Sequence, residues 1–295
     1  MKLKEIIKIV HVSIERDGEF ESLGLVTYAT SSMLAFLENE IYLPRFLQNP
    51  YITCVITNKD LVAGLPEKYG IAISDYPRKA FYELHNYLAT KTNFYWTDFD
   101  SEISNEAIIY PNTYIPPKNV RIGRGTIIEP GATILERSII DEDVIIRAGC
   151  TIGTQGFEFK RIEGSVLSVS HAGSVRICNR VEIQANCAIS RPIFGGFTEI
   201  GEDTKLDNLV HIAHNVRVGK RCFIAACAMI AGSVTIGDDV WIGPGSSISS
   251  EVNIGEHAQI TIGSVVTKDV KSGQRVTGNF AIEHCRFITF LKSIR

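Results

Sequence analysis

Residues 200–219 read IGEDTKLDNLVHIAHNVRVG, and an aliphatic side chain recurs in them at every sixth position. The spacing continues without a miss to Val266, and it also occurs in two earlier blocks. A period of six fits neither an amphipathic helix nor a simple alternating strand. The residues in register are Ile200, Leu206, Ile212, Val218, Ile224, Ile230, Ile236, Ile242, Ile248, Ile254, Ile260 and Val266, preceded by Ile122, Ile128, Ile134, Ile140, Ile146 and Ile152 and by Ile177, Ile183 and Ile189.

This repeat predicts a mainly β fold, a parallel β-helix of hexapeptides in which three short strands close each triangular coil. The aliphatic residue is expected to point into the prism, and the Gly or Ala that often follows it is expected to let the backbone bend. The repeats are interrupted at 154–175 and at 190–199. Because insertions in repeat proteins become loops on one face, we expect both segments to line an active site.

The two ends of the chain lack the six-residue period. The apolar run 51–58 predicts a strand, and 75–90 predicts a helix with Pro77 in its first turn. That helix is expected to bury Ala80, Phe81, Leu84 and Leu88. We therefore predict a small α/β nucleotide-binding domain at 1–105, the β-helix at 106–270, and a short basic segment at 271–295. A helix from about Ile282 in this last segment is expected to cap the open end of the prism.

Composition limits the class of protein. The formal net charge of -3 argues against a general nucleic-acid binder, which is usually basic. No run of about 18 apolar residues predicts a membrane span, and the start MKLKEIIKIVHVSIERDG does not resemble a signal peptide. None of the seven cysteines forms a CxxC pair, so they are expected to be small apolar side chains in a reducing compartment. These observations favour a cytoplasmic enzyme or assembly.

Several motifs resemble the lipid A UDP-3-O-acylglucosamine N-acyltransferase family. The segment from 177 to about 270 carries VEIQANCAISR, HIAHNV and IAGSV in that family's order, and GTQGFEFKR (153–161) resembles its Gly-x-x-Gly-Phe-x-Phe loop. In LAFLENEIY (34–42), Phe36 and Tyr42 keep the spacing of that family's uracil-binding aromatic pair. The resemblance implies a homotrimer of left-handed β-helices. It also implies acyl transfer from a thioester to a nucleotide-linked amino sugar.

Departures from that family narrow the expected substrates. Ser190 stands in place of the family's Asp, Ser250-Glu251 stands in place of its second histidine, and its long helical tail is short here. The motifs GSVVTKDV and VTGNFA resemble the last turns of coenzyme A-dependent sugar acetyltransferases. We therefore expect acyl-CoA as the donor, with acyl-carrier protein as the alternative. The expected acceptor is dTDP-linked, as in the dTDP-4-amino-4,6-dideoxyglucose N-acyltransferases of the anthrose pathway. The alternatives are the lipid A enzyme itself and a non-catalytic hexapeptide scaffold.

His214 is the predicted general base. It follows the inward-pointing Ile212 by two positions, so it is expected to leave the prism wall. Its near-neutral titration suits removal of the amine proton. If the amine arrives neutral, the leaving thiolate takes the proton instead. No metal is expected, because no nearby Cys or carboxylate completes a ligand set with His211 and His214. A metal-binding scaffold needs three converging histidines, and the other candidates, His171, His257 and His284, are scattered along the chain.

The remaining candidate site residues are grouped by the ligand that each is expected to bind. The aromatic pair Phe36 and Tyr42 is expected to stack on a pyrimidine base, unless it belongs to the domain core. Asp207 and Asn208 are expected either to orient His214 or hold the sugar, or to form a turn. Asn215 is expected either to bind the substrate or to form a turn. The two loops add Phe157 and Arg191 to the predicted substrate site.

A backbone N–H at Ala231-Gly232 is expected to stabilise the oxyanion. The pantetheine arm of the donor is placed near Ala225, Ala231, Gly232 and Ile248. Lys268 and Arg286 are candidates for the CoA phosphates, with ordinary solvated charge as the alternative.

Overall fold

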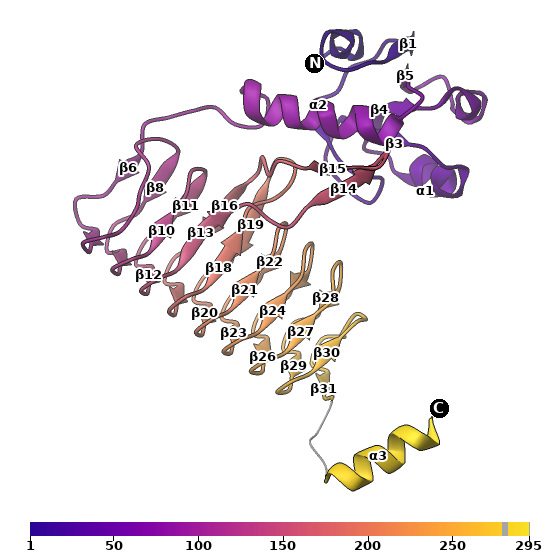
Figure 1. Cartoon of the computed structure of the whole chain (residues 1–295). Helices are drawn as coiled ribbons and strands as arrows, with labels where there is room; N and C mark the ends of the chain where they lie inside the picture. The colour runs from indigo at the N-terminus through magenta and orange to yellow at the C-terminus, as the bar shows by residue number, and fades with distance from the viewer. Residues whose placement is uncertain (279–282, 295) are drawn as a thin grey trace.

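A computed structural model describes residues 1–278 and 283–294 of the chain. A long triangular prism carries a small α/β domain on one side (Figure 1). Successive strands of one wall are joined by parallel pairing: His211 pairs with Met229, and Met229 pairs with Ser247. One coil therefore consists of three hexapeptides, and the fold is the predicted left-handed parallel β-helix.

Three parallel sheets form the walls of the prism. The β21 wall comprises β10 (Thr133–Ile134), β13 (Thr151–Thr154), β18 (Ala188–Ser190), β21 (His211–Ile212), β24 (Met229–Ile230), β27 (Ser247–Ile248) and β30 (Val265–Val266). The β22 wall comprises β6 (Glu102–Ile103), β8 (Val120–Ile122), β11 (Ser138–Ile140), β16 (Ser174–Ile177), β19 (Phe197–Ile200), β22 (Arg217–Val218), β25 (Thr235–Ile236) and β28 (Asn253–Ile254). The β23 wall comprises β7 (Ile108–Ile109), β9 (Ile127–Ile128), β12 (Ile145–Ile146), β17 (Glu182–Ile183), β20 (Lys205–Leu206), β23 (Phe223–Ile224), β26 (Trp241–Ile242), β29 (Gln259–Ile260) and β31 (Arg275–Val276).

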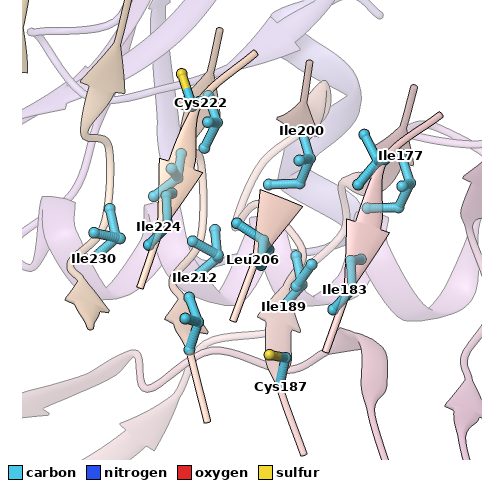
Figure 2. Packing of buried hydrophobic residues seen from close by; sticks show 14 of the residues in the cluster. Ile177, Ile183, Cys187, Ile189, Ile200, Leu206, Ile212, Cys222, Ile224 and Ile230 are labelled. Carbon is cyan, nitrogen blue, oxygen red and sulfur yellow. The ribbon is translucent and has the colours of Figure 1, made fainter. Parts of the chain in front are cut away.

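The predicted inward-pointing residues form the core of the prism. All the aliphatic positions in the three predicted blocks are buried, and Figure 2 shows side chains from successive coils stacked on one another. Cys187 and Cys222 pack in the same core, as expected for small apolar side chains. Each coil buries its apolar positions against its neighbours, so the array is stabilised by stacking.

The backbone bends at the corners of the prism for a reason other than the predicted one. The backbone turns at a residue with a left-handed conformation three positions after the inward-pointing one, for example Asn215 at φ 60° and Arg221 at φ 55°. The small residue directly after the inward-pointing one meets a different need. A Cβ at Gly219 would lie 2.6 Å from Gly237 backbone atoms, and one at Gly243 would lie 2.6 Å from the Ile262 nitrogen. Glycine there allows the coils to approach closely.

The α/β domain contains a five-stranded sheet with the order β1-β5-β4-β3-β2, in which only β1 runs antiparallel to its neighbour. The predicted strand and helix are both confirmed, as β4 and α2, and the four predicted helix residues are buried. The strands are β1 (Ser13–Arg16), β2 (Ser22–Leu23), β3 (Met33–Leu37), β4 (Ile52–Thr57) and β5 (Gly70–Ile73). The helices are η1 (Leu3–Lys8), η2 (Glu40–Tyr42), α1 (Leu43–Gln48), η3 (Lys59–Gly64) and α2 (Pro77–Lys91).

The prism is longer than the range 106–270. It begins with β6, whose Glu102 pairs with Arg121, and it ends with β31, whose Arg275 pairs with Gln259. Ile103, Ile109 and Ile115 do keep the six-residue spacing, but in a register offset by one from Ile122. Because of that offset, the register of the later repeats does not predict the first coil.

The C-terminal helix α3 (His284–Ser293) does not cap the prism as predicted. The expected start at Ile282 lies outside the described residues, none of the described α3 side chains is buried, and the helix stands away from the prism in Figure 1. The last turn of the prism exposes Lys271 and Arg275. Charged side chains at an uncovered strand edge discourage its pairing with another chain. No helix within residues 1–278 and 283–294 is long and apolar enough to cross a membrane.

Candidate functional site

The two interruptions of the repeat attach the α/β domain to the prism. The first forms a hairpin of β14 (Phe159–Ile162) and β15 (Ser165–Ser168), which Figure 1 shows beneath α2. Val169 after this hairpin, and Ile193 and Phe194 in the second interruption, are buried in one cluster with Phe81 of α2. These contacts place the domain over the corner between the β21 and β22 walls.

His214 lies at this corner, and its side chain is 19% exposed. The ring covers Gly232 of the next coil so closely that a Cβ there would lie 2.4 Å from His214 Cε1. Nδ1 is buried without a hydrogen-bond partner among the described residues, and Nε2 lies 4.0 Å from Glu158 Oε2. Burial lowers the pKa of His214 below its ordinary value, while the Glu158 carboxylate acts in the opposite direction. The imidazole is therefore mainly neutral at neutral pH, which is the form that accepts a proton.

His171 packs against His214, although the sequence suggested only a scattered histidine. The two rings meet edge to face with their centroids 5.7 Å apart. His171 is 2% exposed, and neither of its ring nitrogens has a partner in the described chain. Burial, with a smaller contribution from His214, lowers the pKa of His171 to about 4. His85 of α2 fixes this loop, because its Nε2 donates to the carbonyl oxygen of Ser170 at 2.7 Å.

Two residues of the first interruption complete the surroundings of His214. Glu158 forms an ion pair with Lys160, whose ammonium lies 5.2 Å from the centre of the Tyr82 ring. The loop motif GTQGFEFKR was recognised in the sequence, but the approach of its glutamate to a residue more than fifty positions later was not. Only the fold of the hairpin brings the two together.

Of the two amides predicted to stabilise the oxyanion, only one has a free N–H in the described chain. The N–H of Ala231 donates to the Ile248 carbonyl oxygen at 3.1 Å, so it is occupied. The N–H of Gly232 donates to no acceptor in the described chain. Ile248 is wholly buried in the prism because it is itself an inward-pointing residue, so its predicted contact with pantetheine is wrong.

The predicted aromatic pair lines one cavity of about 310 Å³. Phe36 is half-buried, with its ring 5.1 Å from that of Phe81, and Tyr42 is 53% exposed. Basic side chains around the same cavity are Arg45, Arg78 and Lys160. Glu38, which pairs with Arg78, and Glu251 line it as well. The cavity thus combines aromatic side chains with a small excess of positive charge, which suits a base linked to phosphates.

A larger cleft of about 940 Å³ follows the β22 wall and shares Thr27, Arg45 and Glu251 with the aromatic cavity. Asn215 lines this cleft, and its Nδ2 donates to the Tyr28 hydroxyl at 2.6 Å. Its Oδ1 is buried and has no partner in the described part of the chain. Asn215 therefore forms a corner of the prism and also presents a free acceptor near the cleft.

Asp207 and Asn208 do not contact His214. Asp207 Oδ1 accepts a hydrogen bond from the Asn208 amide at 2.7 Å, and Asp207 Oδ2 accepts one from the Ala226 amide at 3.2 Å. Asn208 Oδ1 accepts one from the Ala185 amide at 3.2 Å. Residues seven positions apart in this repeat lie on successive corners, with β21 between them. The pair serves the turn, and the predicted role of orienting His214 is not supported within one subunit.

Other candidates are dispersed. Phe157 is 89% exposed and lies against Phe159, with the ring centroids 5.0 Å apart, rather than in a cavity. Lys268 is exposed on the last coils, and Arg286 is exposed on α3. Arg191 lines a third cavity together with His171.

His211 is exposed on β21, whereas His214 occupies the following corner. The residues that the structure describes contain no group of three or more potential metal ligands. The geometry of this histidine pair therefore offers no completed metal site.

Comparison with known proteins agrees with the repeat. A model of the bacterial transferase hexapeptide (six repeats) matches residues 119–154 and 197–232. A UDP-3-O-acylglucosamine N-acyltransferase from Prochlorococcus marinus is 31% identical, and the match covers 78% of this chain and 76% of the relative. A protein of the same name from Helicobacter pylori is 30% identical over 77% of this chain and 73% of the relative.

Solved structures show the same fold. A UDP-N-acetylglucosamine acyltransferase from Campylobacter jejuni superposes with a TM-score of 0.53 at 20% identity, over 66% of this chain and 79% of that one. LpxA from Acinetobacter baumannii superposes with a TM-score of 0.50 at 24% identity, over 66% and 76% of the two chains.

Proposed function

The chain belongs to the UDP-3-O-acylglucosamine N-acyltransferase family and is an acyltransferase, and we propose that it acylates the amino group of a nucleotide-linked amino sugar from a thioester. One arrangement carries the proposal. A neutral His214 with Glu158 at 4.0 Å packs on Gly232, whose N–H donates to no acceptor in the described chain, beside two connected cavities. The names of the relatives favour a UDP-linked 3-O-acylglucosamine as the acceptor.

The proposed reaction uses few groups. The sugar amine attacks the thioester carbonyl carbon, and the carbonyl oxygen becomes an oxyanion that the Gly232 N–H stabilises. His214 takes a proton from the attacking nitrogen, and Glu158 stabilises the imidazolium. The C–S bond then breaks, the amide is released, and the thiolate takes the proton from His214.

The acceptor is proposed to occupy the two connected cavities. A pyrimidine base between Phe36 and Tyr42 has Arg45 and Arg78 within the same cavity for its phosphates. Lys160 lines that cavity and pairs with Glu158, which in turn faces His214. This continuous row of side chains connects the proposed base site to the proposed proton acceptor.

Glu251 favours a second candidate acceptor. It replaces the second histidine of the lipid A family, lies where the two cavities meet, and has no ion-pair partner among the described residues. A carboxylate there accepts hydrogen bonds from hydroxyl or ammonium groups, which suits a less acylated sugar such as a dTDP-linked amino-deoxysugar. Acyl-CoA is the matching donor for this candidate, and acyl-carrier protein is the donor for the first.

We also propose a homotrimer, in which a neighbouring prism supplies the second wall of the donor site. Mass measurement by light scattering in solution tests this point. A monomeric but active protein would contradict it.

A binding screen tests the proposed substrates. Thermal unfolding is measured with UDP, dTDP, CoA and acyl-carrier protein, because a ligand that binds the folded state raises the unfolding temperature by mass action. One nucleotide and one donor are expected to raise it, and their identities choose between the two candidates. The absence of a response to every ligand would contradict both proposed pairs of nucleotide and donor.

Glu158→Gln is expected to shift the acid limb of the kcat/KM profile to lower pH. Glu158 raises the pKa of His214, so its neutralisation lowers that pKa and keeps the imidazole unprotonated in more acidic solution. The pH–rate profile measures the shift. Glu163→Gln is the matched control, since Glu163 on the same hairpin pairs with Lys79. An unchanged limb, or one displaced upward, would contradict the coupling.

A further inference from the structure

A third cavity of about 720 Å³ lies beside His171, between the end of α2 and the corner of the prism. Arg137 and Arg191 both line it and are half-buried. The Arg137 guanidinium donates from Nη1 to the Ala172 carbonyl oxygen at 2.6 Å. Arg191 Nη1 reaches only the Glu136 carbonyl oxygen, at 3.5 Å, and its buried Nε has no partner in the described chain. Both guanidinium groups are thus held mainly by the backbone.

The two cations have no direct ion-pair partner in the described chain, although the charges of Asp98 and Glu136, which also line the cavity, partly offset them. The Asp98 carboxylate accepts a hydrogen bond from Asn119 instead, at 3.0 Å. Burial, and then the charge of Arg137, lower the pKa of Arg191 to about 10, which indicates that the guanidinium groups repel each other. Partly buried cations that repel each other are stabilised by a bound anion.

We propose that this cavity binds an anionic substituent, a carboxylate or a phosphate, between Arg137 and Arg191. Guanidinium groups present paired N–H donors that match the oxygens of both anions. Lys91 on the rim adds positive charge. His171 lines the cavity and also packs against His214. The anion is therefore expected to belong to a substrate, a statement that rests on the proposed function.

Isothermal titration with inorganic phosphate at low, constant ionic strength tests the site. Wild-type protein is expected to bind phosphate, and Arg191→Gln is expected to weaken binding about tenfold or more, as for loss of a hydrogen bond to a charged group. Arg275→Gln is the matched control, because Arg275 is an exposed arginine at the other end of the prism without an ion pair in the described chain. Its affinity for phosphate should equal that of wild type. Thermal unfolding without phosphate checks that Arg191→Gln folds, and removal of one of two repelling charges should not lower its unfolding temperature.

Competition identifies the substrate that carries the anion. If succinyl-CoA displaces phosphate and acetyl-CoA does not, the anion belongs to the acyl group. If UDP-glucuronic acid displaces phosphate and UDP-glucose does not, the anion belongs to the sugar. Displacement by none of them would contradict a substrate-borne anion. Equal phosphate binding by wild type and Arg191→Gln, or no binding at all, would overturn the site. Acyl transfer with no phosphate binding refutes this inference alone, whereas phosphate binding without acyl transfer refutes the proposed function alone.

Discussion

His214→Ala is expected to lower kcat/KM by about 10²–10⁴-fold, the contribution of a positioned general base. The reason is the environment of the ring, since burial keeps it neutral and Glu158 stands ready to stabilise the imidazolium. Release of the donor thiol in the presence of the nucleotide sugar measures the rate. The nucleotide affinity should change little, because His214 is not among the residues that line the aromatic cavity.

His211→Ala provides the matched control for this result. His211 is exposed on β21 three residues earlier, and its loss should leave the rate close to that of wild type. An undiminished rate in His214→Ala would show that the leaving thiolate, or the solvent, removes the amine proton. An equal loss in both variants would instead indicate damage to the coil.

Tyr42→Ala is expected to weaken nucleotide binding by about five- to 150-fold, which corresponds to the 1–3 kcal/mol of a base stacked on an aromatic ring. Tyr42 is the better probe of the pair because it is 53% exposed, whereas Phe36 packs on the core residues Phe81 and Tyr82. Titration calorimetry with UDP and dTDP gives the two affinities. At saturating nucleotide sugar, kcat should stay near the wild-type value, because the stacking is the same in the ground and transition states.

Tyr51→Ala is the control for Tyr42→Ala. Tyr51 is 44% exposed on the same domain and lines none of the described cavities. It should bind nucleotides like wild type. Unchanged affinity in Tyr42→Ala, together with binding by the wild type, would remove the aromatic cavity from the proposed base site.

The prism was predictable because its core is one periodic rule applied many times. Every predicted inward-pointing residue is buried, and β4 and α2 follow from short local patterns. The first coil was missed because Ile103, Ile109 and Ile115 are offset by one residue. The reason for the small residue in each repeat was also wrong, because a single repeat cannot reveal how closely the next coil approaches.

The site was predictable in part. The position of His214 outside the prism core follows from its register, and the structure brings Phe36 and Tyr42 to one cavity. Glu158 and His171 were missed because the interruptions have no period, and only the docking of that loop on α2 brings them to His214. Asp207 takes the turn role that was its alternative, and Ile248 is buried in the core. A six-residue repeat alternates corners and core positions, so closeness in sequence does not imply a shared face.

The most direct test is the mass of the product formed from an acyl thioester and a nucleotide-linked amino sugar. Wild-type protein, given acetyl-CoA or an acylated acyl-carrier protein with UDP- and dTDP-linked amino sugars, is expected to add one acyl group to the amine for each thiol released. The same nucleotide sugars without an amine should gain none, and His214→Ala should form the product far more slowly. Release of thiol without an amide product, or acylation of the amine-free sugar at the same rate, would contradict the proposed N-acyl transfer.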